Sequence, residues 1–125
     1  MPLKDLVVDA DEHTESQIEQ IVGSYLRYDL DGKGIVLMPE FGSLTNDKKI
    51  LVYLTALKGW KFVTEDEVDI STAPSELEGA LGIKGNSLRP KLKSLFDKRL
   101  IQKEGKQYNV PISSLSSIAA MIDDE

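Results

Sequence analysis

Residues 72–111, TAPSELEGALGIKGNSLRPKLKSLFDKRLIQKEGKQYNVP, decide the fold of this chain. A short helix is predicted over residues 74–81, because its apolar residues fall on one face and Pro74 is tolerated in the first turn of a helix. Gly79 in the middle of this helix favours a close approach by another backbone. Gly82 follows as a turn residue that can adopt a positive φ. The stretch therefore begins with a short helix and a tight turn.

A basic helix is predicted next, over residues 86–99. Its possible first residues are Gly85, Asn86 and Ser87, and Pro90 favours Asn86 or Ser87, since proline removes a hydrogen bond anywhere beyond the first helical turn. The residues expected to face inward repeat at helical spacing and are Leu88, Leu92, Leu95 and Phe96. A β-hairpin follows over residues 101–110, with Gly105 at its tip. As a whole, the stretch predicts two helices joined by a turn and then a hairpin.

Further helices are predicted on both sides of this stretch. Thr45 is a favourable N-cap for a helix that runs to Lys58. Thr14 starts a capping box ahead of an amphipathic helix over residues 14–28. Residues 112–122 place their large apolar side chains on one face of a last helix.

The basic residues of the chain are concentrated in one segment. The 125 residues include 15 basic and 21 acidic ones, for a net charge of -6. Residues 84–106 hold eight basic and two acidic residues, so this segment carries +6 and the rest of the chain -12. Because the Debye length is about 8 Å at physiological salt, a local basic surface can act on an acidic protein.

A basic helix beside a hairpin suits duplex DNA. A helix fits the major groove, and an adjacent hairpin can lie over the neighbouring backbone or minor groove. Arg89 and Lys93 are the best candidates for reaching base edges, and the amides at the start of the helix attract phosphate. The alternative is that these cations only solvate the surface. The full set of candidate DNA-binding residues is Lys84, Asn86, Ser87, Arg89, Lys91, Lys93, Ser94, Lys98, Lys103 and Lys106.

Residues 46–111 resemble the winged-helix domains of bacterial and archaeal transcriptional regulators of the MarR, TrmB and ArsR kinds. The matching segments are APSELEGALGI for the first helix and turn, SLRPKLKSLFDKRLI for the recognition helix and QKEGKQYNV for the wing. Arg99 stands where those families usually have a glycine, and Pro90 interrupts a helix that is usually regular. The resemblance implies a prokaryotic DNA-binding protein, although winged helices also serve as protein-interaction modules.

Three parts follow one another along the chain. Residues 1–44 comprise an acidic arm, the helix over 14–28 and a short strand over 35–38. Residues 45–111 form the winged helix-turn-helix, and residues 112–125 form the last helix with an acidic tail. The expected fold class is mainly α with a small β-hairpin wing (α+β), a winged helix-turn-helix with an added N-terminal helix and a C-terminal helix.

Two functions fit this organisation. In the first, the chain is a sequence-specific or general DNA-binding protein, a transcriptional regulator that reads double-stranded DNA with helix 86–99 and wing 101–110. We expect a homodimer through helices 14–28 and 112–122, which would set two recognition helices about 34 Å apart on DNA. In the second, the winged helix is a protein–protein interaction module in a larger nucleic-acid-processing complex, with the acidic N-terminal part as its adhesive surface.

Residues 29–40 overlap the template of a calcium-binding loop. Asp29, Asp31 and Glu40 would be its ligands. Lys33 counts against this site, because it puts an ammonium group where a ligand oxygen belongs. The plainer interpretation is a turn between a helix and a strand, and we expect no other metal site.

The sequence contains few candidates for catalytic residues. The single histidine, His13, lies in the acidic arm, cysteine is absent, and the glycines do not form a phosphate-binding loop. We therefore expect no enzymatic activity and no cofactor. No apolar run approaches the roughly 20 residues that span a bilayer, and the first residues lack the apolar core of a signal peptide. These features predict a cytoplasmic protein with no membrane partner.

Overall fold

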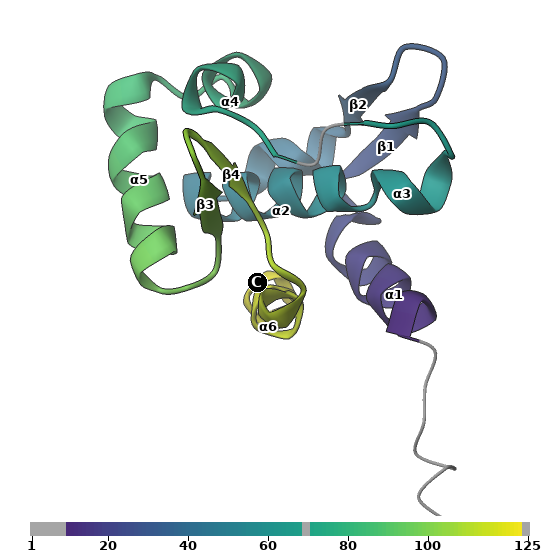
Figure 1. The fold of residues 1–125 in the computed structure, drawn as a ribbon. Coiled ribbons are helices and arrows are strands. Elements are labelled where there is room, and N and C mark those ends of the chain that lie inside the picture. Colours follow the sequence, from purple (N-terminus) through teal and green to yellow (C-terminus); the bar gives the residue numbers. More distant parts are fainter. Residues whose placement is uncertain (1–9, 69–70, 124–125) are drawn as a thin grey trace, which may run out of the picture.

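A computed structural model of the protein describes residues 10–68 and 71–123 (Figure 1). These residues form a mainly helical structure with two short antiparallel hairpins, and this confirms the expected α+β class. The helices are α1 (Ala10–Val22), α2 (Asn46–Lys58), α3 (Trp60–Val63), α4 (Pro74–Leu81), α5 (Gly85–Asp97) and α6 (Leu115–Asp123). The strands are β1 (Leu26–Asp29), β2 (Gly34–Leu37), β3 (Gln102–Glu104) and β4 (Gln107–Asn109). Short 3₁₀ helices span Pro39–Ser43 and Ile112–Ser114.

Helix α2 is the centre of the fold. It contacts α1, α3, α4, α5, α6 and β4. Ile50, Leu51 and Leu54 have no exposed surface, as expected for a helix that is covered on most sides. The helix starts where the sequence predicts, since the Thr45 hydroxyl accepts a hydrogen bond from the amide of Lys48 at 3.4 Å.

The prediction of one helix over residues 14–28 is wrong. Helix α1 begins earlier, at Ala10, and ends at Val22, where the Gly23 amide still bonds to the Glu19 carbonyl. Thr14 is therefore a buried residue inside the helix and not its cap. Residues 26–29 form strand β1 because they pair with β2, in the register Leu26↔Leu37 to Asp29↔Gly34. The predicted strand over 35–38 is β2, shifted by one residue.

The segment that overlaps the calcium-loop template forms a hairpin turn. Residues 30–33 join β1 to β2, so the segment is a hairpin and does not follow a helix. The Asp29 carboxylate accepts from the amides of Asp31 and Gly32 at 3.1 and 3.2 Å. Lys33 pairs with Asp66 at 2.7 Å, which ties the hairpin tip to the loop after α3. Within residues 10–68 and 71–123, no group of three or more acidic or histidine side chains is placed to hold a metal ion.

Helices α4 and α5 follow the predicted order with three corrections. Helix α4 spans the predicted residues, and Gly82 adopts φ +69°, but Gly79 is exposed with no heavy atom within 4 Å of an added Cβ. Helix α5 begins at Gly85 and ends at Asp97, so Pro90 lies beyond its first turn. Phe96 is 45% exposed and does not face the core.

The end of α5 explains the unusual Arg99. Its φ is +63°, in the left-handed region that favours glycine. The Leu100 amide bonds to the Leu95 carbonyl at 3.0 Å, and the Arg99 amide to the Phe96 carbonyl at 2.9 Å. This pair of bonds is the Schellman motif, which places the residue after the helix cap in the left-handed conformation.

A third chain segment joins the β3–β4 hairpin. Gln102 pairs with Asn109, and the loop between the strands contains Gly105 at φ +62°, as the predicted tip requires. Thr72 forms an isolated antiparallel bridge to Tyr108, with backbone bonds of 3.0 and 2.8 Å. The hairpin is therefore held to the segment that leads into α4.

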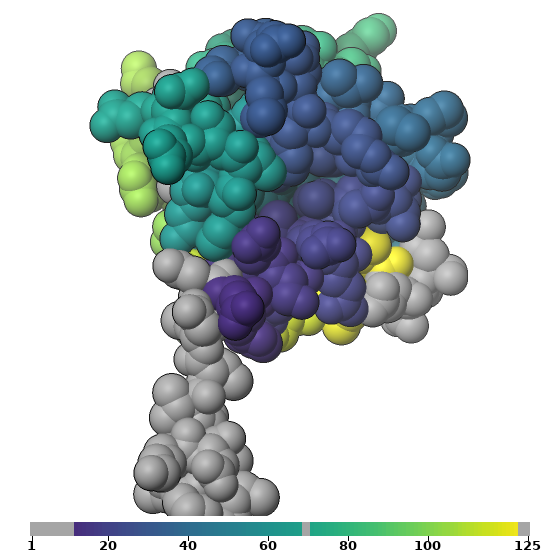
Figure 2. Space-filling model, turned by 90° about the vertical axis from the view of Figure 1, so that its right-hand side faces the viewer, coloured from purple at the N-terminus to yellow at the C-terminus, as the bar shows by residue number. Residues whose placement is uncertain are grey.

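Helices α1 and α6 pack against each other and against α2. Ile18 and Ile21 on α1 are buried, as are Ile118 and Ile122 on α6. Helix α6 is preceded by a 3₁₀ turn, so the predicted helix over 112–122 has two parts. Figure 2 shows α1, the β1–β2 hairpin and α3 together on one face of the molecule. The apolar faces of α1 and α6 are thus covered within a single chain.

Candidate nucleic-acid interface

Helix α5 buries one stripe and leaves two basic edges exposed. Leu88, Leu92 and Leu95 are at most 1% exposed and define the buried side. One edge carries Arg89 and lies toward the hairpin, and the other carries Lys91 and lies toward the start of α2. Figure 1 shows α5 at one end of the molecule, with α4 and the β3–β4 hairpin next to it.

The hairpin edge of α5 meets two lysines of the β3–β4 hairpin. A shallow cavity of about 330 Å³ lies between α5, the start of α4 and the hairpin. Its lining combines Arg89 with Lys103, Lys106 and the first residues of α4, and consists of Ala73, Pro74, Ser75, Arg89, Lys103, Lys106 and Tyr108. Among the described residues, no acidic side chain lines this cavity. Three cations around a shallow depression favour the binding of phosphate groups.

Tyr108 lies in β4, on the hairpin side of this cavity. Its backbone is fixed by both bonds of the bridge to Thr72. The Lys103 ammonium lies 5.7 Å from the centre of the Tyr108 ring, on the opposite strand of the hairpin. Lys103 is exposed, so its ammonium group is accessible to an anion.

Lys91 on the other edge is already paired. Its ammonium lies 3.4 Å from the Asp47 carboxylate in the first turn of α2. That oxygen is buried and has no hydrogen-bond partner among the described atoms. Lys91 is the one cation of segment 84–106 that forms an ion pair with a described residue.

The other candidate residues are distributed along α5. The exposed ones are Lys84, Asn86, Ser87, Lys93 and Lys98, whereas Ser94 is half-buried. Lys84 is the N-cap, and its carbonyl accepts from the amides of Ser87 and Leu88. The Glu78 carboxylate lies beside Gly85, 2.7 Å from the place of an added Cβ. A carboxylate of the chain itself therefore borders the start of α5, where the sequence favours a phosphate.

Sequence reasoning missed four residues around this surface, namely Asp47, Ser75, Glu78 and Tyr108. Tyr108 could have been found, because a hairpin centred on Gly105 sets it opposite Lys103. The positions of Asp47 and Glu78 depend on how α2 and α4 pack against α5, which no local pattern records.

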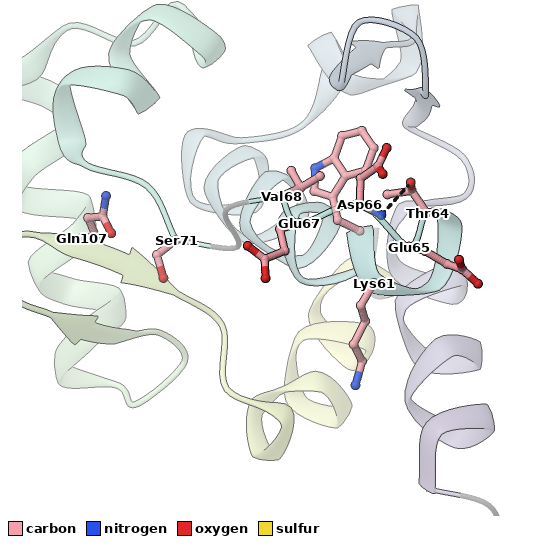
Figure 3. A pocket seen from close by; sticks show the side chains of 9 residues that line it. Lys61, Thr64, Glu65, Asp66, Glu67, Val68, Ser71 and Gln107 are labelled. Carbon is pink, nitrogen blue, oxygen red and sulfur yellow. Dashed lines mark hydrogen bonds between the residues drawn. The ribbon is translucent and has the colours of Figure 1, made fainter.

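A larger cavity of about 850 Å³ has the opposite character. It lies beneath the loop after α3, and Figure 3 shows Ser71 and Gln107 on one side and the loop from Thr64 to Val68 on the other. The Thr64 hydroxyl accepts from the Asp66 amide at 3.2 Å. Glu65, Asp66 and Glu67 line this cavity together with Lys61, so acidic side chains outnumber the basic one. The chain therefore separates an acidic face from the basic one.

No protein-family model, curated protein or solved structure matches this chain. Among the helices of the described residues, none has both the length and the apolar character needed to cross a bilayer.

Proposed function

We propose that this chain is a winged-helix protein that binds duplex DNA and acts as a transcriptional regulator. Helix α5 is the recognition helix, and the β3–β4 hairpin is the wing. The element order supports this assignment: α2, the Thr72 bridge, α4, α5 and a hairpin that pairs with the bridge. The winged-helix domains that residues 46–111 resemble have their helices and hairpin in the same order.

The observation that carries the proposal is the meeting of Arg89, Lys103 and Lys106. These cations come from two elements and line one cavity, to which the described part of the chain contributes no acidic side chain. A helix in the major groove with a hairpin on the adjacent backbone would present both elements to the same duplex. Phosphate contact is the main role of these cations and of Lys93, which is exposed on α5.

The proposal includes a homodimer. A two-fold dimer would set two copies of α5 one turn of DNA apart, about 34 Å. Because the apolar faces of α1 and α6 pack within one chain, a dimer through these helices would use their remaining polar surface. Light scattering at several protein concentrations tests this part separately.

Exposed apolar side chains support a second candidate function, a protein-interaction module in a nucleic-acid-processing complex. Phe96 is 45% and Ile112 is 54% exposed. Phe96 lines a cavity of about 460 Å³ together with Arg99 and Pro111. A partner that buries these side chains would bind with little dependence on salt.

A salt titration of duplex DNA binding separates the two candidates. DNA binding predicts an affinity that falls steeply between 50 and 200 mM salt, by about 10³-fold or more for six phosphate contacts. Arg89→Ala is expected to weaken binding while the thermal midpoint stays unchanged. Undetectable or salt-independent binding by the wild-type chain would contradict the DNA-binding proposal.

A further inference from the structure

We infer that Asp47 withholds Lys91 from nucleic acid, so that the two basic edges of α5 are not equivalent. The inference rests on the proposed function and adds a regulatory contact to it. The Nζ atom of Lys91 on α5 lies 3.4 Å from the Oδ1 atom of Asp47 in the first turn of α2. Their side chains are 47% and 31% exposed. Each is within reach of solvent, so the contact can open.

The environment of Asp47 explains why the contact persists. Its Oδ1 atom is buried and has no hydrogen-bond partner among the described atoms, so the Lys91 ammonium is the group that offsets its charge. Moving Lys91 to a DNA phosphate would leave that oxygen buried without a counter-charge, which opposes the transfer. The Asp47 charge would also face the approaching phosphates. Both effects lower the affinity of this edge for any polyanion.

The cations of the hairpin edge form no ion pair with a residue that the structure describes. Arg89, Lys103 and Lys106 line a cavity to which these residues add no acidic side chain, and Lys93 is exposed one turn beyond Arg89. Asp47 therefore directs DNA toward the wing side of α5. The consequence is a lower non-specific affinity than the charge of segment 84–106 alone would give.

Two lysines of the same helix provide the matched comparison. Lys91→Ala is expected to leave the salt dependence of duplex DNA binding nearly unchanged, because the paired Lys91 contacts no phosphate, and to lower the affinity only through the uncovered Asp47 charge. Lys93→Ala is expected to reduce the slope of log K against log salt by about 0.9, the loss of one phosphate contact. Equal effects of the two substitutions would overturn the inference.

Asp47→Asn is the direct test. Release of Lys91 is expected to raise affinity for a non-specific duplex roughly two- to fivefold at low salt and to steepen the slope by about 0.9. In the double variant Asp47→Asn/Lys91→Ala, both gains should disappear. A gain that persists in the double variant, or no gain in Asp47→Asn, contradicts release of Lys91.

Thermal melts of each variant separate an effect on binding from an effect on folding. If Asp47→Asn keeps the wild-type midpoint, its affinity is compared directly with that of the wild-type chain. If its midpoint is lower, all titrations are run well below that midpoint, and the double variant is compared with Lys91→Ala. Those two chains both lack the lysine, so the slope of log K against log salt should be the same in both, and a difference in slope would contradict the inference.

Glu15→Gln on α1 is the control for net charge, since it removes one negative charge away from α5. It should leave the slope unchanged. If the wild-type chain shows no salt-dependent DNA binding, the proposed function and this inference both fail. If the wild-type chain binds and Asp47→Asn behaves like Glu15→Gln, the inference alone fails.

Discussion

The hydroxyl of Tyr28 donates a hydrogen bond to the carbonyl of Ala56 at 2.6 Å, and this bond joins the β1–β2 hairpin to the end of α2. The Tyr28 ring also meets the Trp60 ring edge-on, with centroids 4.9 Å apart. Tyr28→Phe should lower the free energy of unfolding by about 1 kcal/mol, the usual net value of one such bond. Urea unfolding at pH 8 measures this loss, and an unchanged midpoint would show that the bond contributes nothing.

The same tyrosine predicts a pH effect. Burial raises the pKa of Tyr28 from 10.0 to about 12. Because the folded state has the higher pKa, the contribution is complete below pH 10 and is lost as the pH rises toward 12. The stability difference between wild type and Tyr28→Phe should therefore shrink as the pH is raised from 10.0 to about 12. A constant difference over this range would contradict the burial of the hydroxyl.

Gly59 and Gly79 should respond to alanine with opposite signs. A Cβ on Gly59 would collide with the Tyr28 hydroxyl and approach Ile18 to 3.1 Å, whereas one on Gly79 meets no heavy atom within 4 Å. Gly59→Ala should destabilise the fold by about 1–3 kcal/mol. Gly79→Ala should stabilise it by up to about 1 kcal/mol, because it improves the helix propensity of α4. Thermal melts compare the two, and a shared sign would contradict the packing at Gly59.

Arg99 is expected to be a site where glycine stabilises the protein. Its φ of +63° is unfavourable for a side chain with a Cβ. Arg99→Gly should therefore raise the free energy of unfolding by about 0.5–1 kcal/mol. Lys98, with φ −80°, is the matched control, and Lys98→Gly should give no gain. Chemical denaturation of both variants measures the effect, and a loss of stability in Arg99→Gly would contradict the Schellman geometry.

The Lys33–Asp66 ion pair predicts an acid-sensitive contact. The hydrogen bond and the charge of Lys33 lower the pKa of the Asp66 carboxyl below its ordinary 3.8. Since the folded pKa is the lower one, the contact stabilises the fold above pH 3.8 and is lost as the pH falls through the folded value. Lys33→Gln should return the pKa of Asp66 toward 3.8, as measured by NMR titration of the carboxyl carbon. No change would mean that the pair does not persist in solution.

Local signals predicted the middle of the fold well, because caps and turn residues act over a few positions. Thr45 caps α2, Gly82 ends α4 and Gly105 turns the hairpin, all as expected. Leu26 misled the prediction at the N-terminal side. It continues the helical spacing of Ile18 and Val22, yet it also alternates with Tyr28 as in a strand, and its pairing with Leu37 of β2 decides between the two.

The sequence predicts which residues belong to the candidate site, but it does not predict how they are arranged in space. Charge density singled out Arg89, Lys103 and Lys106, but their common cavity depends on the tertiary packing of the hairpin against α4 and α5. Lys91 was grouped with them because sequence records its charge and not its partner. Asp47 lies on a different helix, so its contact with Lys91 follows only from the packing of α2 on α5.

The most direct measurement of DNA binding by the wing compares two double variants that each remove two positive charges. Lys103→Gln/Lys106→Gln changes the β3–β4 hairpin, and Arg27→Gln/Lys33→Gln changes the β1–β2 hairpin. Fluorescence anisotropy with a labelled duplex at several salt concentrations gives the slope of log K against log salt. The wing variant should lose about 1.8 from the magnitude of this slope, and the control should keep the wild-type slope. Equal slopes in the two variants, or no salt-dependent binding by the wild-type chain, would contradict a DNA-binding role.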